Sequence, residues 1–211
     1  MAISPDVVKL IQAEHERAHI RGDVLTIGRQ PLEDGTTDRQ LFDELGAATL
    51  MAMDVSDYEG ATIIHDLNKP LPVALHGICD FLFDGSCLDN LFDPANALRS
   101  FAKMLRPGGR MMLVEHGTAI QGALICFSPE WFYDFFAANG YELHGITLLP
   151  FPAGRWEPKQ WVPYEGGKPV TASPGTEIGD FYTVVIAEKR AESTDGRALI
   201  QAQYRVLHGG Q

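Results

Sequence analysis

The chain lacks the features of a protein that binds anionic polymers or membranes. Its 211 residues hold 17 Lys and Arg against 28 Asp and Glu, which gives a formal net charge of −11, and the basic residues form no cluster. A surface of this sign repels nucleic-acid phosphates and anionic lipid. No apolar run approaches the roughly 18 residues of a membrane-spanning helix, and no apolar segment of a secretory signal is visible. We therefore expect no nucleic acid and no membrane span, and a cytoplasmic location.

Cysteine is also scarce. The three cysteines, Cys79, Cys87 and Cys126, are odd in number and have no metal-ligand spacing, so we expect reduced thiols and no metal. The chain is nevertheless long enough to bury a core without disulfides or metals. Internal repeats and low-complexity tracts are absent from the sequence, and we expect a single domain over residues 1–211.

Short apolar runs alternate with segments of helical character. The expected strands cover residues 24–28, 48–53, 62–65, 78–83, 111–114, 141–149 and 181–188, and the expected helices residues 4–20, 40–45, 94–105 and 128–138. This alternation is typical of parallel βαβ units. It predicts an α/β, doubly wound, Rossmann-like fold with a mostly parallel seven-stranded sheet and helices on both faces.

About 150 residues make this fold, and three segments lie outside its core. Residues 1–21 are interpreted as an N-terminal cover helix. Residues 150–180 are rich in Pro and Gly and contain Trp156 and Trp161, which suggests a lid over an apolar or ring-bearing substrate. The C-terminal tail, residues 189–211, is weakly helical from residue 197 to 207 and is a candidate contact for a homodimer.

Acidic residues occupy four of the first five strand ends, at Asp54, Asp66, Asp84 and Glu115. In parallel sheets, ligands bind outside the carboxyl ends of the strands. Asp54 follows Gly28 by 26 residues (54 − 28), a spacing at which nucleotide-binding folds bind ribose hydroxyls; the alternative is a solvated loop acid. Asp66 is placed to accept from an adenine amino group, and the alternative is a local turn or cap.

Two candidates for proton transfer lie farther along the sheet. The fourth strand ends in Asp84 and Gly85, where glycine permits close backbone approach and the carboxylate is able to position or deprotonate a substrate group. His116, just past the fifth strand, is our first choice for a base because its ordinary pKa is near neutrality. The alternative for His116 is a surface or helix-capping role.

The most specific string is Leu-Arg-Pro-Gly-Gly-Arg at residues 105–110, where a helix must end, turn and enter a buried strand. Together with Asp-Phe-Leu-Phe-Asp at residues 80–84 and Leu-Asp-Asn-Leu-Phe-Asp-Pro at residues 88–94, it resembles the second half of class I S-adenosylmethionine-dependent methyltransferases. The resemblance covers about residues 22–149 and 181–188.

The resemblance implies S-adenosylmethionine as cofactor and methyl transfer to an oxygen or nitrogen of a small molecule, or of a glycan or lipid-linked precursor. The cofactor-binding residues it implies are Gly28, Arg29, Gln30, Asp54, Asp66, Leu67, Asp84 and Gly85. Acceptor contacts are expected from Tyr133, Trp156 and Trp161, although the helical spacing around Tyr133 favours core packing.

The first glycine motif departs from the family pattern. Thr26 stands where the family usually has an acid, and Gly28 alone remains of the early glycines. One interpretation is a rebuilt turn in which Arg29 or Gln30 contacts the cofactor carboxylate. The other is a binding or scaffold protein that keeps the fold without catalysis. A dinucleotide oxidoreductase ranks last, because the turn lacks the G-x-G-x-x-G pattern.

Overall fold

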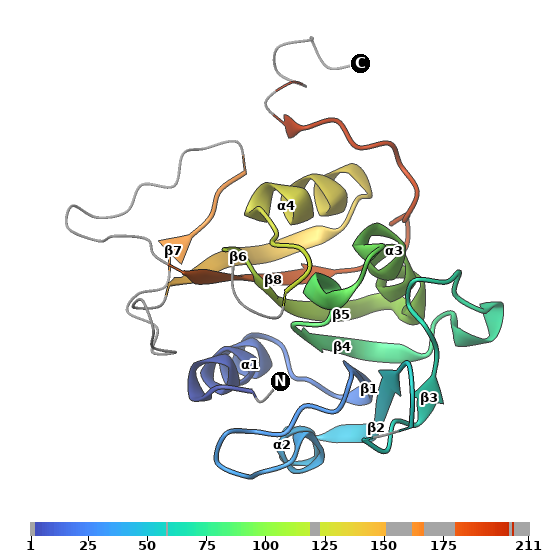
Figure 1. Cartoon of the computed structure of the whole chain (residues 1–211), viewed down its shortest axis with the longest axis vertical. Coiled ribbons are helices and arrows are strands. Elements are labelled where there is room, and N and C mark those ends of the chain that lie inside the picture. The colour runs from blue at the N-terminus through green and yellow to red at the C-terminus, as the bar shows by residue number, and fades with distance from the viewer. Residues whose placement is uncertain are drawn as a thin grey trace.

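One twisted sheet runs through the centre of the molecule (Figure 1). The computed structural model describes residues 3–57, 59–118, 123–150, 162–166, 180–202 and 204. The strands are β1 (Gly22–Ile27), β2 (Ala47–Asp54), β3 (Ile63–Ile64), β4 (Cys79–Gly85), β5 (Leu105–His116), β6 (Glu142–Pro150), β7 (Val162–Pro163) and β8 (Phe181–Glu188), and their order in the sheet is β3-β2-β1-β4-β5-β8-β6-β7. Strands β1 to β5 are mutually parallel, and β8 is antiparallel to both of its neighbours, β5 and β6.

The predicted Rossmann-like, mostly parallel fold is confirmed, and each of the seven expected strands is present. The two-residue β7 adds a short strand at the edge beside β6. Strand β5 begins at Leu105, earlier than expected, because Leu105 already pairs with Cys79. The predicted sharp turn is a bulge inside this strand: the pairing shifts register after Cys79, and Gly108 has a φ of +81°, a conformation that favours glycine.

Helices begin where the sequence offers capping side chains. Ser4 accepts from the Val7 amide, Asp93 from the Asn96 amide, and Thr37 forms a capping box with Gln40; such caps satisfy backbone N–H groups that have no partner within a helix. The resulting helices are α1 (Pro5–Arg17), α2 (Asp38–Glu44), α3 (Pro94–Met104) and α4 (Pro129–Ala138).

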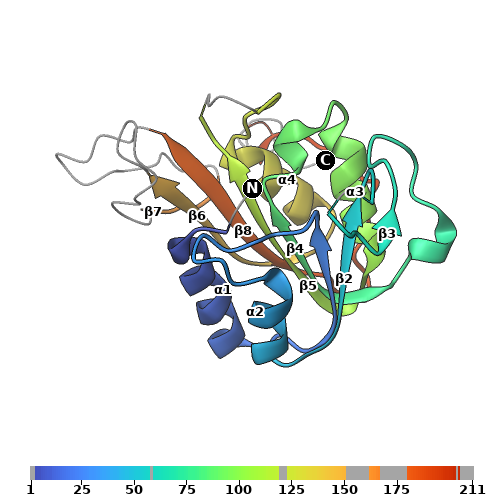
Figure 2. The ribbon, with the colours of Figure 1, turned by 60° about the horizontal axis from the view of Figure 1, so that its bottom comes forward.

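The helices form a layer on each face of the sheet. Helices α1 and α2 cover one face and α3 and α4 the other (Figure 2). Along β4 the side chains alternate, so that Phe81 and Phe83 pack in the core beneath α1 and α2, while Leu82 packs in the core beneath α3 and α4. Because successive side chains of a strand point to opposite faces, this alternation also decides where the polar residues at the strand ends point.

The first described part of the C-terminal tail packs on the layer formed by α3 and α4. The Lys189 ammonium donates to two backbone carbonyls at the end of α3, at 2.7 and 2.9 Å, and Asn139 accepts from the Arg197 amide at 3.1 Å. The helix expected from residue 197 to 207 is absent over residues 197–201, because contacts to α4 hold the chain in an irregular path. The remainder of that expected helix is mostly outside the described residues.

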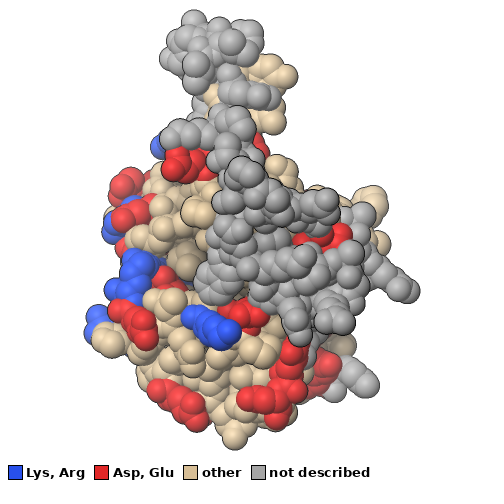
Figure 3. Space-filling view, turned by 90° about the vertical axis from the view of Figure 1, so that its left-hand side faces the viewer, with Lys and Arg blue, Asp and Glu red and all other residues tan. Residues whose placement is uncertain are grey.

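Of the expected lid, residues 162–166 and 180 are described, along with the end of β6, and Trp156 and Trp161 lie outside the described residues. No helix in the described ranges has the length and apolar character needed to cross a membrane. On the face shown in Figure 3, basic side chains lie among acidic ones and do not form a continuous patch.

Candidate functional site

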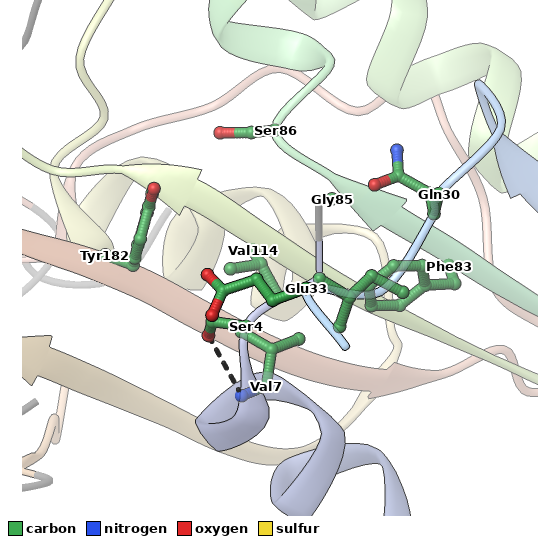
Figure 4. A pocket seen from close by; sticks show the side chains of 10 residues that line it. Ser4, Val7, Gln30, Glu33, Phe83, Gly85, Ser86, Val114 and Tyr182 are labelled. Carbon is green, nitrogen blue, oxygen red and sulfur yellow. Dashed lines mark hydrogen bonds between the residues drawn. The ribbon is translucent and has the colours of Figure 1, made fainter. Parts of the chain in front are cut away.

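Two adjoining cavities open at the carboxyl ends of the parallel strands. The first, which we name the strand-end cavity, measures about 400 Å³ and is lined by residues that include Gly28, Gln30, Asp54, Asp66, Leu67 and Gly85. The second, the helix cavity, measures about 200 Å³ and lies between α1 and the ends of β4, β5 and β8 (Figure 4). Gln30, Gly85 and Ser86 line both cavities, so a ligand in one lies next to a ligand in the other.

Gln30 forms the partition between the cavities. Its side chain is buried, and its Nε2 donates to the Ile27 carbonyl at 2.9 Å. Its Oε1 lies 2.7 Å from the position that a Cβ would take on Gly85. The carboxamide therefore bridges the ends of β1 and β4, in the space above the two glycines where a ligand backbone would otherwise approach.

The rest of the divergent turn is held by internal contacts. The Arg29 guanidinium lies 3.6 Å from the Asp38 carboxylate and donates to the Gly60 carbonyl at 3.2 Å, while still lining the strand-end cavity. Thr26 is fully buried, and its hydroxyl donates to the Met51 carbonyl at 3.4 Å. The position that usually carries an acid therefore contributes no charge to the cavity.

Asp54 and Asp66 both line the strand-end cavity. Asp54 is the last residue of β2; its Oδ1 accepts from the Val55 amide at 2.6 Å, and its Oδ2 lies 3.8 Å from the Cβ position of Gly28. Asp66 accepts from the backbone and side-chain amides of Asn68 at 3.0 and 3.1 Å, and the backbone bond lowers its pKa. The local turn expected as an alternative for Asp66 is thus present, at a position that also faces the cavity.

Two polar residues beside Asp66 were not among the predicted site residues. His65 lines the strand-end cavity, and its Nε2 is buried with no hydrogen-bond partner among the described residues. The Asn68 Oδ1 accepts from the amides of Phe92 and Asp93 at 3.1 and 3.0 Å, which ties the loop after β3 to the loop before α3. Their place directly after a strand is the one sequence signal that points to them.

Ser86 belongs to a buried polar cluster at the ends of β4 and β5. Its members are Asp84, Ser86, Asp89, Glu115 and His116. The Ser86 hydroxyl donates to Asp89 Oδ2 at 2.6 Å, and His116 Nδ1 contacts the same oxygen. The Asp89 amide donates to Glu115 Oε2 at 3.1 Å. Ser86 itself has a φ of +70°, which is uncommon for a residue other than glycine. Neither Ser86 nor Asp89 is among the residues predicted for the site.

Asp84 and Glu115 form a carboxyl pair within this cluster. Both are fully buried, and burial raises the pKa of Asp84 to about 7 and that of Glu115 well above its ordinary value. Asp84 shares a face of β4 with Leu82, on the side of α3 and α4, so it lies beneath the floor and is not among the residues that line either cavity. His116 is likewise not among the described residues that line the cavities, so direct contact of either side chain with a ligand stays a prediction.

His116 and Tyr133 have contrasting positions. The His116 imidazole is buried, with its ring centroid 4.6 Å from that of Tyr182, a residue that lines the helix cavity. This excludes the alternative of a surface histidine. Tyr133 lies on α4, where it packs against the core on the opposite face of the sheet, and it is not among the described residues that line the cavities. Core packing, the alternative for Tyr133, is the arrangement observed.

Comparisons with known proteins identify the fold. No protein-family model and no curated protein matches the sequence. Among solved structures, the chain is similar to the Burkholderia thailandensis 1,6-didemethyltoxoflavin-N1-methyltransferase with bound 1,6-didemethyltoxoflavin and S-adenosylhomocysteine, with a TM-score of 0.55, 15% identity, and coverage of 87% of this chain and 78% of that one. It is also similar to an S-adenosylmethionine-dependent methyltransferase from Mesorhizobium loti, with a TM-score of 0.54, 15% identity, and coverage of 86% and 98%.

A third similar structure bears a different activity in its name. The cyclase SpnF matches with a TM-score of 0.51 and 14% identity, covering 87% of this chain and 81% of that one. Because a fold does not fix an activity, these similarities establish the class I methyltransferase fold. The chemistry must be argued from the two cavities.

Proposed function

We propose that the protein binds S-adenosylmethionine in the strand-end cavity and transfers its methyl group to a small-molecule acceptor in the helix cavity. The observation that carries this proposal is the direct contact of the two cavities at Gln30, Gly85 and Ser86. Methyl transfer depends chiefly on aligning donor and acceptor, and adjoining cavities provide such an alignment. The similar 1,6-didemethyltoxoflavin-N1-methyltransferase structure likewise holds a small molecule, 1,6-didemethyltoxoflavin, together with S-adenosylhomocysteine.

The nucleoside end of the strand-end cavity fits this cofactor. Asp54 at the end of β2 is suited to accept from ribose hydroxyls, and Leu67 offers an apolar wall for the adenine ring. Asp66 and the buried Nε2 of His65 are polar groups for the edge of the base. The volume of about 400 Å³ lies in the range of small-molecule sites, roughly 300–1,000 Å³.

The amino-acid end is remodelled. Thr26 is buried and carries no charge. The Gln30 carboxamide and the Arg29 guanidinium are therefore the polar groups of this turn that line the cavity. We propose that Gln30 or Arg29 contacts the cofactor carboxylate. When bound, the cofactor supplies an electrophilic methyl on a sulfonium, and the protein needs to add only orientation and a route for a proton.

For that proton, we propose His116 as base and Asp89 as the residue that positions it. Asp89 contacts His116 Nδ1 and also accepts from Ser86, which lines both cavities. Fixing one imidazole nitrogen orients the ring and sets its tautomer. Asp84, whose raised pKa suits proton storage at neutrality, remains the second candidate and acts from beneath the floor. Oxygen and nitrogen acceptors both remain open, in a small molecule or in a glycan or lipid-linked precursor.

A specific observation also favours the second candidate, a binding or scaffold protein without catalysis. The Gln30 side chain occupies the space above Gly28 and Gly85. Thr26 stands at the position of the usual acid, so the first motif has no carboxylate there. If Gln30 cannot leave this space, the amino-acid end of the cofactor has no room.

Titration distinguishes the two candidates. The full chain is titrated with S-adenosylmethionine, with S-adenosylhomocysteine and with NADH, by calorimetry and by thermal shift. Methyltransferase function predicts a rise in melting temperature with the first two ligands, because a ligand that binds only the folded state stabilises it. The absence of a shift with all three ligands at millimolar concentration would support the scaffold protein.

A further inference from the structure

The walls of the helix cavity are mainly apolar. Ile3 and Val7 come from the N-terminal segment, and Phe83 and Val114 from the ends of β4 and β5. The volume of about 200 Å³ is below the roughly 300–1,000 Å³ of drug-sized sites. The cavity is therefore suited to a small acceptor with an apolar body, such as a single ring.

One carboxylate lies at the rim of this apolar space, on an exposed residue. Glu33 lies on the loop between β1 and α2, and Figure 4 shows its carboxylate directed between Ser4 and Ser86, in front of Val114. Among the described residues that line the helix cavity, Glu33 is the sole member with a formal charge at neutral pH, and Lys and Arg are absent from that set. The cavity thus offers an apolar body site with a negative group at its rim.

The groups behind the cavity wall have the same sign. Asp89, Glu115 and Glu33 all add to the effect of burial in raising the pKa of the Tyr182 phenol, which means that negative charge is disfavoured there. Asp89 and Glu115 are buried behind the wall, whereas Glu33 lines the cavity itself. Glu33 is therefore the acidic side chain that a ligand in the helix cavity would contact directly.

We propose that the helix cavity takes a small amine or basic nitrogen heterocycle as methyl acceptor, in preference to a carboxylate or phosphate. This inference rests on the proposed function, which makes the ligand of the helix cavity the methyl acceptor, and on Glu33, which supplies the negative charge. In the transfer, the bound cation first passes its nitrogen proton to His116, the proposed base, while Glu33 stays ionised as its counter-ion. The freed nitrogen lone pair then forms the new N–C bond, and the C–S bond of the sulfonium donor breaks with its electrons moving to sulfur. The products are the methylated amine and the neutral thioether.

The experiment compares three probes of nearly equal shape: benzylamine, benzyl alcohol and benzoate. Binding to the full chain is measured by ligand-observed NMR, with and without S-adenosylhomocysteine. We expect benzylamine to bind most tightly and benzoate least. In Glu33→Gln the advantage of the amine over the alcohol should fall by about threefold to fivefold, the size expected for a partly solvated ion pair. Glu44→Gln removes the same charge from an exposed position on α2 and should leave the order and ratios unchanged.

Each contrary result has a distinct meaning. Equal or tighter binding of benzoate, an amine preference that survives Glu33→Gln, or no binding of any probe overturns the acceptor inference. A failure of S-adenosylhomocysteine to bind, measured in the same samples, overturns the proposed methyl transfer instead. Because the probe comparison is also made without the cofactor product, the two failures are separable.

Discussion

The carboxamide of Gln30 and the α-carbon of Gly85 share one small volume between the two cavities. A Cβ added to Gly85 would lie 2.7 Å from Gln30 Oε1 and 3.1 Å from its Cδ, closer than side-chain atoms normally approach. The two residues come from different strand ends, yet each limits the size of the other. Both residues line both cavities, so this pair sets the space available where the strand-end cavity adjoins the helix cavity.

The substitution Gly85→Ala should destabilise the fold by displacing the Gln30 carboxamide from its bond to the Ile27 carbonyl. The expected loss is about 1 kcal/mol, the net value of one such hydrogen bond. In a Gln30→Ala background the same substitution should cost less, because the two Gln30 atoms are gone, although Phe83 Cε1 remains 3.1 Å from the added Cβ. Denaturant unfolding of the four proteins in this cycle measures the coupling, and purely additive free energies would contradict the shared volume.

The substitution Asp54→Asn tests the nucleoside end of the strand-end cavity. Loss of a charged acceptor for hydroxyl groups costs about 1.5–3 kcal/mol, so S-adenosylhomocysteine should bind roughly 10-fold to 100-fold more weakly. Calorimetry gives the dissociation constant directly. Asp57→Asn, at an exposed position in the loop that follows β2, is the matched control and should bind as the wild type does. Equal affinity of the two variants would remove Asp54 from the proposed site.

The carboxyl pair predicts an unusual dependence of stability on pH. Because burial raises the pKa of Asp84 to about 7, the folded state binds more protons than the unfolded state between the ordinary carboxyl pKa and neutrality. The contribution of this group is fully present at acid pH and is lost as pH rises through about 7.

The free energy of unfolding, measured with denaturant from about pH 5 to about pH 8, should therefore fall up to about pH 7, with a slope of up to about 1.4 kcal/mol per pH unit for one proton. Asp84→Asn keeps a side-chain oxygen that accepts from Glu115 and removes the ionisable group, so it should flatten the decline. The exposed Asp43→Asn, on α2, is the control. An unchanged slope in Asp84→Asn would show that the pair does not store a proton.

Asp89→Asn should be among the more destabilising single substitutions in the chain. Asp89 is fully buried and contacts both Ser86 Oγ and His116 Nδ1, and losing the charged acceptor of buried hydrogen bonds costs about 1.5–3 kcal/mol. Asp93→Asn is a suitable control, because Asn caps a helix as well as Asp does and Asp93 caps α3. Thermal unfolding of both variants measures the difference, and equal melting temperatures would contradict a supporting role for Asp89.

The order of strands and helices could be predicted because it depends on local signals. The apolar run at residues 78–83 and the caps at Ser4 and Asp93 each indicate an element without reference to the rest of the chain. The polar cluster could not be predicted in this way. Asp89 and Ser86 read as loop residues, and they become a buried pair only because β5 brings His116 beside them.

The site residues also differ in whether local sequence signals or three-dimensional contacts decide their positions. Asp54 and Asp66 reach a cavity because parallel strands end at one edge of a sheet, which the sequence order already implied. The face of β4 on which Asp84 lies could not be predicted, because it depends on the register of a single residue. Glu33 carried no signal at all, since its position depends on the three-dimensional path of an irregular loop between β1 and α2.

That loop has a consequence for how this protein diversifies or is engineered. Residues 28–37 supply Gln30 to the junction of the two cavities and Glu33 to the rim of the helix cavity. Under the proposed function, donor recognition and acceptor selectivity are thereby both encoded in one short connection between β1 and α2. A graft of a glycine-rich turn from a related fold would alter both properties at once, whereas point changes at Glu33 and Gln30 separate them.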